Sequence, residues 1–386
     1  MPKTVLSIVS TLGRCGPVIG MMNVARYLDP LRYRAVIGTL SPEPADSLID
    51  EFRSLGVPIR QLGLSRLESL FSGVRTLRSL VSEVRPDLVH SHGLRADILV
   101  AKARPNCPIV ATVHSDLLAD YRFAYGRPVG TVAAMREYAA LRRFDGVNAV
   151  SDPLAEDLLR SGIQARGIMN GVELGEFHPA PDARAIQEIR TQLGWSLDAV
   201  VVLHTGVLRN LKSPLQVVEG FRASALSGHG FLVFAGDGPL RSECEKAADG
   251  ASNIMFLGKR RDVSNLLRAA DVLISASSSE GLGTALLEGC ASGVRVLATD
   301  IPAHKYIESI FPGQVQIFGQ STAASVAKAL DSISNQDAQQ KFTPSPSALE
   351  RMSNRGMSSQ YQEFYSAILQ STPGAIPEIE TAAVRP

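Results

Sequence analysis

The chain contains a strand-like run, a glycine-rich turn and two glutamates, residue types that together can hold a sugar diphosphate. Residues 272–276 are apolar, a Ser-rich turn follows, and Glu280 then leads into a helical pattern that contains Glu288. The residues between Glu280 and that helix are Gly281, Leu282, Gly283 and Thr284. Glycines let a backbone approach a ligand closely, and the free N–H groups at a helix start attract a phosphate. The pattern therefore predicts a diphosphate at the turn, sugar hydroxyls at Glu280 and a ribose at Glu288.

Two further strand-like segments end in polar residues. Residues 86–92 end at His92, and residues 109–116 contain His114 beside a serine and an aspartate. Ligands of open parallel sheets lie beyond the carboxyl ends of the strands. We therefore expect both histidines to face one crevice, while a purely structural role for a histidine at a strand end stays open.

The two glutamates also carry a resemblance to a known family. Seven residues separate Glu280 from Glu288, and Ala291-Ser292-Gly293 and the run 296–300 follow. This arrangement resembles the signature of the retaining glycosyltransferases of family 4, and further matches extend over about residues 1–370. The resemblance implies an α/β chain with the GT-B fold, in which two Rossmann-like, doubly wound domains face each other across a cleft.

The resemblance implies a role for each matching residue. Glu280 would hold the transferred sugar and His114 would line the reacting face, which makes these two the candidate catalytic residues. The residues expected to bind the donor are Gly16, Arg209, Lys212, Gly281, Leu282, Gly283, Thr284 and Glu288. Among these, Lys212 would balance the charge on the leaving diphosphate. Arg14 and His92 are expected on the acceptor side.

One position departs from the family pattern. The family has an arginine where this chain has Val207. Either Arg209, two residues further along, supplies the second cation beside the leaving diphosphate, or the site is weaker than in the family. The same departure supports the alternative that the chain is a nucleotide-sugar-binding subunit without catalytic activity.

Strand-like runs alternate with helical patterns in both halves of the chain, which indicates two α/β domains. The sequence predicts an acceptor-side domain over residues 1–180 and a nucleotide-sugar-binding domain over residues 181–354. By resemblance, a helix over about residues 355–370 packs back on the first domain. Residues 371–386 are rich in Pro and Ala and are expected to form a flexible tail.

Residues 66–84 carry apolar side chains at helical spacing with arginines among them. Two interpretations stay open: one helix or a pair of helices facing the core with solvated arginines, and a helix on a membrane surface. The second matters because many relatives in the family use lipid-linked acceptors. No apolar run approaches the roughly 18 residues that a membrane span needs. We therefore expect a cytoplasmic protein, soluble or peripheral at the inner face of the membrane.

Composition argues against several other classes of protein. The 39 basic and 38 acidic residues give a net charge of +1, which speaks against a nucleic-acid partner. The four cysteines lie far apart, as in cytosolic proteins with reduced thiols. No two aspartates are separated by a single residue, so the Asp-x-Asp pair that holds a metal-bound nucleotide in other transferases is absent. We expect neither a metal nor another cofactor.

The sequence thus predicts a retaining glycosyltransferase that moves a sugar from a nucleotide-diphosphate sugar to a hydroxyl acceptor in the synthesis of a polysaccharide, a glycolipid or another cell-surface glycan. The acceptor stays open among a growing glycan, a lipid-linked sugar and a small molecule. A nucleotide-sugar epimerase of the same architecture is an alternative, because such enzymes also hold a diphosphate in a cleft. A nicotinamide oxidoreductase fits less well, since Gly13, Gly16 and Gly20 lie one residue further apart than the dinucleotide fingerprint requires.

Overall fold

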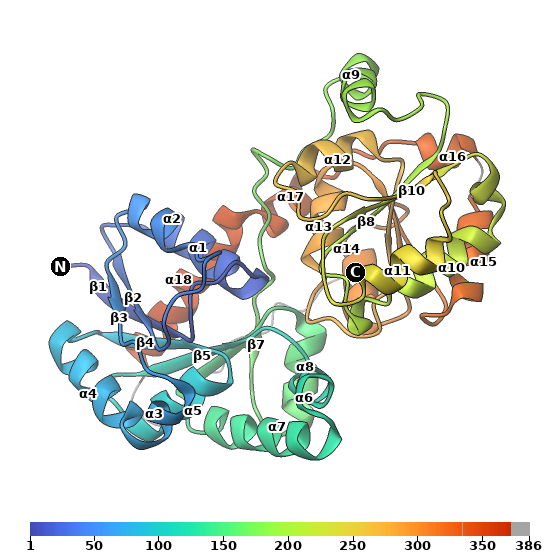
Figure 1. The fold of residues 1–386 in the computed structure, drawn as a ribbon. Helices are drawn as coiled ribbons and strands as arrows, with labels where there is room; N and C mark the ends of the chain where they lie inside the picture. The colour runs from blue at the N-terminus through green and yellow to red at the C-terminus, as the bar shows by residue number, and fades with distance from the viewer. Residues whose placement is uncertain (334, 372–386) are drawn as a thin grey trace. The chain divides into compact units, whose positions relative to one another are not determined.

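The computed structural model describes residues 1–333 and 335–371 (Figure 1). The chain divides into two compact units, each a parallel sheet covered by helices. The first unit contains Met1–Gly171 together with the described chain from Asn354 onward, and the second contains Val172–Ser353. The predicted α/β fold with two doubly wound domains is confirmed.

The first unit is built on a seven-stranded parallel sheet with the strand order β3-β2-β1-β4-β5-β6-β7. Its strands are β1 (Lys3–Val9), β2 (Tyr33–Thr39), β3 (Ile59–Gln61), β4 (Leu88–His92), β5 (Ile109–Val113), β6 (Gly146–Ala149) and β7 (Arg166–Gly167). β1 pairs with both β2 and β4, so the strand order reverses at β1 and β4. The carboxyl ends of strands at such a reversal are where doubly wound sheets bind their ligands.

Helices cover both faces of this sheet. They are α1 (Gly16–Arg26), α2 (Ile49–Ser54), α3 (Arg66–Phe71), α4 (Gly73–Val84), α5 (Leu94–Ala103), α6 (Leu117–Tyr125), α7 (Arg127–Leu141), α8 (Asp152–Arg160) and α18 (Asn354–Gln370). The last of them, α18, packs on this first unit although it ends the described chain. Its residues Tyr361, Phe364 and Tyr365 are buried with strand residues in one apolar cluster, and Ser358 donates a hydrogen bond to the carbonyl of Val24 in α1.

The arginine-bearing segment of residues 66–84 forms two helices that meet at Ser72. Leu77 and Leu80 of α4 are buried in an apolar cluster with residues of α5 and of the sheet, so α4 is a core-facing helix. The shorter α3 leaves its large apolar side chains exposed to solvent; these are Leu67, Leu70 and Phe71. The helical spacing therefore covers two elements with different surroundings.

The second unit has a six-stranded parallel sheet with the strand order β10-β9-β8-β11-β12-β13. Its strands are β8 (Val201–Thr205), β9 (Phe231–Ala235), β10 (Ile254–Phe256), β11 (Val272–Ser275), β12 (Arg295–Thr299) and β13 (Val315–Phe318). Its α-helices are α9 (Ala183–Leu193), α10 (Pro214–Ala223), α11 (Arg241–Ala248), α12 (Val263–Ala269), α13 (Thr284–Ala291), α14 (Pro302–Ile310), α15 (Ala323–Asp331), α16 (Asn335–Gln339) and α17 (Pro346–Met352). The strand order reverses at β8 and β11, and the loops after these two strands carry most of the predicted donor site.

Residues 172–180, placed in the first domain by the sequence analysis, group with the second unit in the structure. The backbone explains this: the Val172 N–H donates to the carbonyl of Met352, and the Arg268 guanidinium donates to the carbonyls of Glu176 and His178. The expected tail at residues 371–386 lies, apart from Ser371, outside the described residues. Over the described parts of the chain, no helix has the length and apolar character needed to cross a membrane.

Candidate active site

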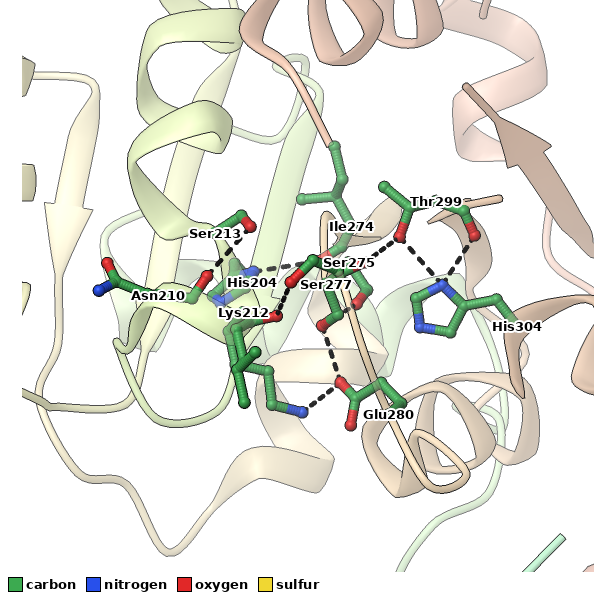
Figure 2. A network of polar contacts seen from close by, with 12 residues as sticks. His204, Asn210, Lys212, Ser213, Ile274, Ser275, Ser277, Glu280, Thr299 and His304 are labelled. Carbon is green, nitrogen blue, oxygen red and sulfur yellow. Dashed lines mark hydrogen bonds and ion pairs between the residues drawn. The ribbon is translucent and has the colours of Figure 1, made fainter. Parts of the chain in front are cut away.

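The candidate site in the second unit lies at the carboxyl ends of β8 and β11, its two central strands. The loop after β8 ends in a short 3-10 helix, Asn210–Lys212, and the loop after β11 carries Glu280. Lys212 and Glu280 are 68 residues apart in the chain, and their side chains form an ion pair (Figure 2). The side chains are only 20% and 11% exposed, respectively. A cation and a carboxylate are thus held together at the edge of the sheet where ligands bind.

A network of hydrogen bonds holds Glu280 in place (Figure 2). The Ser277 hydroxyl donates to Glu280 Oε1 over 2.7 Å, and the Thr299 hydroxyl donates to the carbonyl of Ser277. His304, at the start of α14, contributes its Nδ1–H to the carbonyl of Thr299 over 2.9 Å. The network therefore joins the loops after β8, β11 and β12 into one polar cluster around Lys212 and Glu280.

The charges in this cluster follow from its surroundings. Burial opposes ionisation of Glu280, but the Lys212 ammonium and the hydrogen bonds from Lys212 and Ser277 outweigh it, so the pKa of Glu280 lies below its ordinary value. Burial lowers the pKa of His304 to about 4, and burial together with the Lys212 charge lowers the pKa of His204 to about 4. Near neutral pH the site therefore has one carboxylate, one ammonium and two uncharged imidazoles.

The glycine-rich turn passes directly into α13. Gly283 is the residue before the helix and has φ +89°, a left-handed conformation that favours glycine. No side chain caps the first turn of α13, whose N–H groups point away from the helix body. His304 packs beneath this turn, since a Cβ on Gly283 would lie 3.6 Å from His304 Cδ2. The predicted glycine turn and helix start are thus present, and anion binding by them stays a prediction.

Glu288 lies one helical turn further along α13 and differs from Glu280 in its charge state. Burial, with a smaller contribution from the charge of Glu176, raises the pKa of Glu288 to about 7 from its ordinary 4.5. Among the residues that the structure describes, no cation offsets this burial as Lys212 does for Glu280. The two glutamates of the predicted motif are therefore electrostatically different groups.

The loop after β8 also contains the position that departs from the family pattern. Val207 is exposed, and the partly buried Arg209 lies in the same loop, where its carbonyl accepts a hydrogen bond from the Lys212 N–H over 2.9 Å. Arg209 forms no ion pair with any residue that the structure describes, so its guanidinium is available to an anionic ligand. A second cation is thus present in the loop although Val207 replaces an arginine.

The predicted residues of the first unit form a separate group. His92 and His114, at the carboxyl ends of β4 and β5, are hydrogen-bonded to each other, with 3.2 Å between His92 Nδ1 and His114 Nε2. Gly16 begins α1, and nothing lies within 4 Å of the position of its absent Cβ. Arg14 forms an exposed ion pair with Glu51 at 2.9 Å, so its guanidinium already has a partner in the free protein. 

Sequence reasoning missed three polar residues of the second-unit site: Ser277, His204 and His304. His304 is fully buried and His204 is 1% exposed, and each has an Nε2 without a hydrogen-bond partner among the described residues. One signal was present in the sequence, because His204 lies near the end of β8 and His304 comes shortly after β12, at the edge of the sheet where Glu280 lies. Ser277 was assigned only to the turn.

Known proteins resemble this chain in both halves. Residues 16–171 match the family described as Glycosyl transferase 4-like domain, and residues 199–335 match the family described as Glycosyl transferases group 1. The putative glycosyltransferase EpsF of Bacillus subtilis is 25% identical over 310 residues, which cover 77% of this chain and 79% of that protein. The UDP-Gal:alpha-D-GlcNAc-diphosphoundecaprenol alpha-1,3-galactosyltransferase of Escherichia coli is 25% identical over 267 residues, covering 66% of this chain and 68% of that protein.

Solved structures share the fold over nearly the whole chain. The crystal structure of Anabaena HepE in complex with UDP and glucose has a TM-score of 0.77 at 19% identity and covers 94% of this chain and 99% of that one. Sucrose-phosphate synthase from Thermosynechococcus elongatus also has a TM-score of 0.77 at 19% identity, with 94% and 98% covered. These structural matches establish the common two-domain architecture.

Proposed function

This chain belongs to the group 1 glycosyltransferases of the GT-B fold and is a sugar transferase, and we propose that it transfers a sugar from a UDP-sugar to a hydroxyl of a growing or lipid-linked glycan with retention of anomeric configuration. The observation that carries the proposal is the Lys212–Glu280 pair beside the uncapped start of α13. The relatives reported above are named as glycosyltransferases, one of them as a putative one, which does not favour the epimerase or the non-catalytic subunit.

The choice of donor and acceptor is supported by the relatives. The Escherichia coli relative is named for UDP-Gal and for a diphosphoundecaprenol-linked acceptor, and the HepE structure contains UDP and glucose. In this chain, the turn of residues 281–284 would receive the diphosphate, Glu288 the ribose and Glu280 the hydroxyls of the transferred sugar. Gly16, at the start of α1, would lie against the donor diphosphate.

In the proposed reaction, the acceptor oxygen forms a bond to the anomeric carbon on the face from which the diphosphate leaves. The bond between that carbon and the phosphate oxygen breaks, and the departing phosphate oxygen takes the acceptor's proton. Lys212, Arg209 and the N–H groups of α13 would stabilise the negative charge that develops on this oxygen. Because these groups supply positive charge, we propose that no metal is required. His114 would line the reacting face.

A direct test measures the release of UDP from UDP-glucose, UDP-galactose and UDP-N-acetylglucosamine with and without undecaprenyl-diphosphate-linked sugars. We expect UDP release from one of these donors only when an acceptor is present, and a product with the donor's anomeric configuration. EDTA should not change the rate of this reaction. Acceptor-independent conversion of the sugar would support the epimerase instead. Binding of a UDP-sugar without turnover on any acceptor of this class would contradict the proposed reaction.

The shifted pKa of Glu288 predicts a pH dependence of donor binding. With a pKa of about 7, Glu288 is mostly protonated at pH 6 and mostly ionised at pH 8. An ionised carboxylate accepts hydrogen bonds from ribose hydroxyls more strongly, so UDP-glucose affinity should be about tenfold higher at pH 8 than at pH 6. Isothermal titration calorimetry at both pH values checks this. Glu288→Gln should bind more weakly and without this pH dependence, whereas equal affinities in the wild type would refute the assignment.

We propose that peripheral membrane contact at the inner, cytoplasmic face involves helices α6 and α7 of the first unit. Helices α6 and α7 expose five large apolar side chains that are 41–61% exposed: Phe123, Tyr125, Val129, Val132 and Met135. Exposed arginines lie among them: Arg122, Arg127 and Arg136. The close packing of α6 on α7 depends on Gly130, where a Cβ would lie 2.2 Å from the carbonyl oxygen of Tyr121. Apolar and aromatic side chains interspersed with arginines suit an anionic bilayer surface.

Vesicle co-sedimentation tests this α6–α7 face. The full chain should bind vesicles with 30 mol% phosphatidylglycerol and not pure phosphatidylcholine vesicles. Phe123→Ser/Met135→Ser should weaken binding by about tenfold or more, because each substitution removes a large apolar side chain that the bilayer would bury. Leu159→Ser is the control, since Leu159 of α8 is 62% exposed but lies outside this face. No binding to the anionic vesicles, or a loss in Leu159→Ser as large as that in Phe123→Ser/Met135→Ser, would refute the contact.

A further inference from the structure

Three histidines gather at the carboxyl ends of β4 and β5 in the first unit. His90 and His92 lie two residues apart in β4, and their ring centroids are 4.2 Å apart. His114 follows β5, and its ring centroid lies 5.5 Å from that of His92. Only His114 has a role in the proposed reaction. The roles of His90 and His92 are inferred from their hydrogen bonds.

His90 has a partner on each ring nitrogen, and the network fixes its tautomer. The Thr112 hydroxyl donates to Asn148 Oδ1 over 2.8 Å, so it accepts the hydrogen bond from His90 Nε2, which is 2.7 Å away. His90 Nδ1, 2.8 Å from the Tyr365 hydroxyl, must then accept. His90 is therefore a satisfied structural group that ties β4 to β5 and α18.

His92 and His114 differ from His90 because their hydrogen bond joins ring to ring. Burial lowers the pKa of His114 to about 4, and burial with the neighbouring imidazoles holds the pKa of His92 well below its ordinary value. Both rings are thus neutral near pH 7, and each carries one proton on one of its two nitrogens. Because one of the facing nitrogens, His92 Nδ1 or His114 Nε2, must donate and the other accept, the tautomers of the two rings are coupled.

This coupling has a consequence at the outer nitrogens. If His92 Nδ1 donates, His114 Nε2 is the acceptor and the proton of His114 sits on Nδ1; if His114 Nε2 donates, His114 Nδ1 carries a lone pair. His92 Nε2 and His114 Nδ1 are both buried and have no hydrogen-bond partner among the described residues. The two rings also border a cavity of about 20 Å³, room for roughly one small polar group. The outer nitrogens therefore form the part of the pair that can serve a ligand.

We propose that His92 is a positioning residue, whose hydrogen bond fixes the ring orientation of His114 and couples the tautomer of His114 to its own. The proposal rests on the proposed function, in which His114 lines the reacting face, and it replaces the expected acceptor contact of His92 with an action through His114. A carboxylate or carbonyl usually orients a functional histidine in this way. Here a second neutral imidazole does so, which leaves the first histidine uncharged.

The test uses two substitutions of different hydrogen-bonding capacity. Asparagine places a donor or acceptor close to the position of His Nδ1, so His92→Asn should keep the bond to His114, whereas His92→Leu removes it. We expect His92→Leu to lower kcat about tenfold, the effect of roughly one lost hydrogen bond, with little change in KM for the donor. His92→Asn should restore most of kcat. Thermal unfolding of both variants shows whether stability and kcat vary separately.

A second measurement does not depend on activity. In protein labelled with ¹⁵N-histidine, the ring nitrogen shifts of His114 report its tautomer directly. We expect the shift of a hydrogen-bonded His114 Nε2 in the wild type and in His92→Asn, and a changed tautomer distribution with that bond lost in His92→Leu. Unchanged His114 shifts in His92→Leu would overturn the proposal. If His92→Leu does not fold, His92→Gln, whose amide mimics Nε2 rather than Nδ1, takes its place. If His92→Leu alters the His114 shifts but the wild-type protein shows no transferase activity, the coupling is upheld and the proposed function is rejected.

Discussion

Replacing Lys212 with methionine is expected to lower kcat for sugar transfer by about 100- to 1,000-fold, the usual effect of removing one group that stabilises a developing anion. Lys212 is held in the free protein by Glu280 at the carboxyl edge of the sheet. A diphosphate bound at the start of α13 would place a second anion within reach of the same ammonium. The charge on the leaving oxygen grows during the reaction, so the loss should fall mainly on kcat rather than on KM.

The measurement is steady-state UDP release with the best donor and acceptor from the panel. Lys246→Met is the matched control, because Lys246 is an exposed lysine on α11 that contributes to no part of the site, and it should keep wild-type rates. Lys212→Arg should recover part of the activity through its positive charge. A Lys212→Met protein with wild-type kcat would rule out this residue as the stabilising cation and would direct attention to Arg209.

The largest expected effect on stability concerns Arg190, which is almost completely buried in α9. Its guanidinium forms an ion pair with Asp271 and donates to the carbonyls of Ala269 and Ala199 over 2.9 and 3.1 Å. Arg190→Met would leave the carboxylate of Asp271 buried without its cation. We expect the free energy of unfolding of the second unit to fall by about 3–5 kcal/mol.

Urea unfolding followed by tryptophan fluorescence can measure this loss in the second unit alone. The chain has one tryptophan, Trp195, which is buried in that unit and whose backbone N–H donates to the carbonyl of Arg190. Arg184→Met, on the same helix, is the control, because the ion pair of Arg184 with Glu188 is exposed and should contribute less than about 1 kcal/mol. Arg190→Met/Asp271→Leu should be less destabilised than Arg190→Met. A loss no larger than that of the control would refute the role of this buried pair.

The sequence by itself determined the fold class, the alternation of strands and helices in both halves, and the residues of the central motif. These features are local: an apolar run forms a buried strand, glycines allow the turn, and the helix start follows directly in the chain. Because all strands of a parallel sheet point the same way, a residue that follows a strand lies at the carboxyl edge. Glu280, Lys212, His92 and His114 were therefore assigned to the correct edges of their sheets without any knowledge of the tertiary structure.

The tertiary structure decided which of these residues touch and in which charge state. The ion pair of Lys212 with Glu280 and the hydrogen bond of His304 depend on loops from three different strands, whose spacing is set by sheet packing. Sequence spacing does not distinguish the charge states of Glu280 and Glu288, yet a neighbouring cation lowers the pKa of the first and burial raises that of the second. Desolvation and charge at a side chain come from everything packed around it, so only the folded chain separates a paired carboxylate from a buried one.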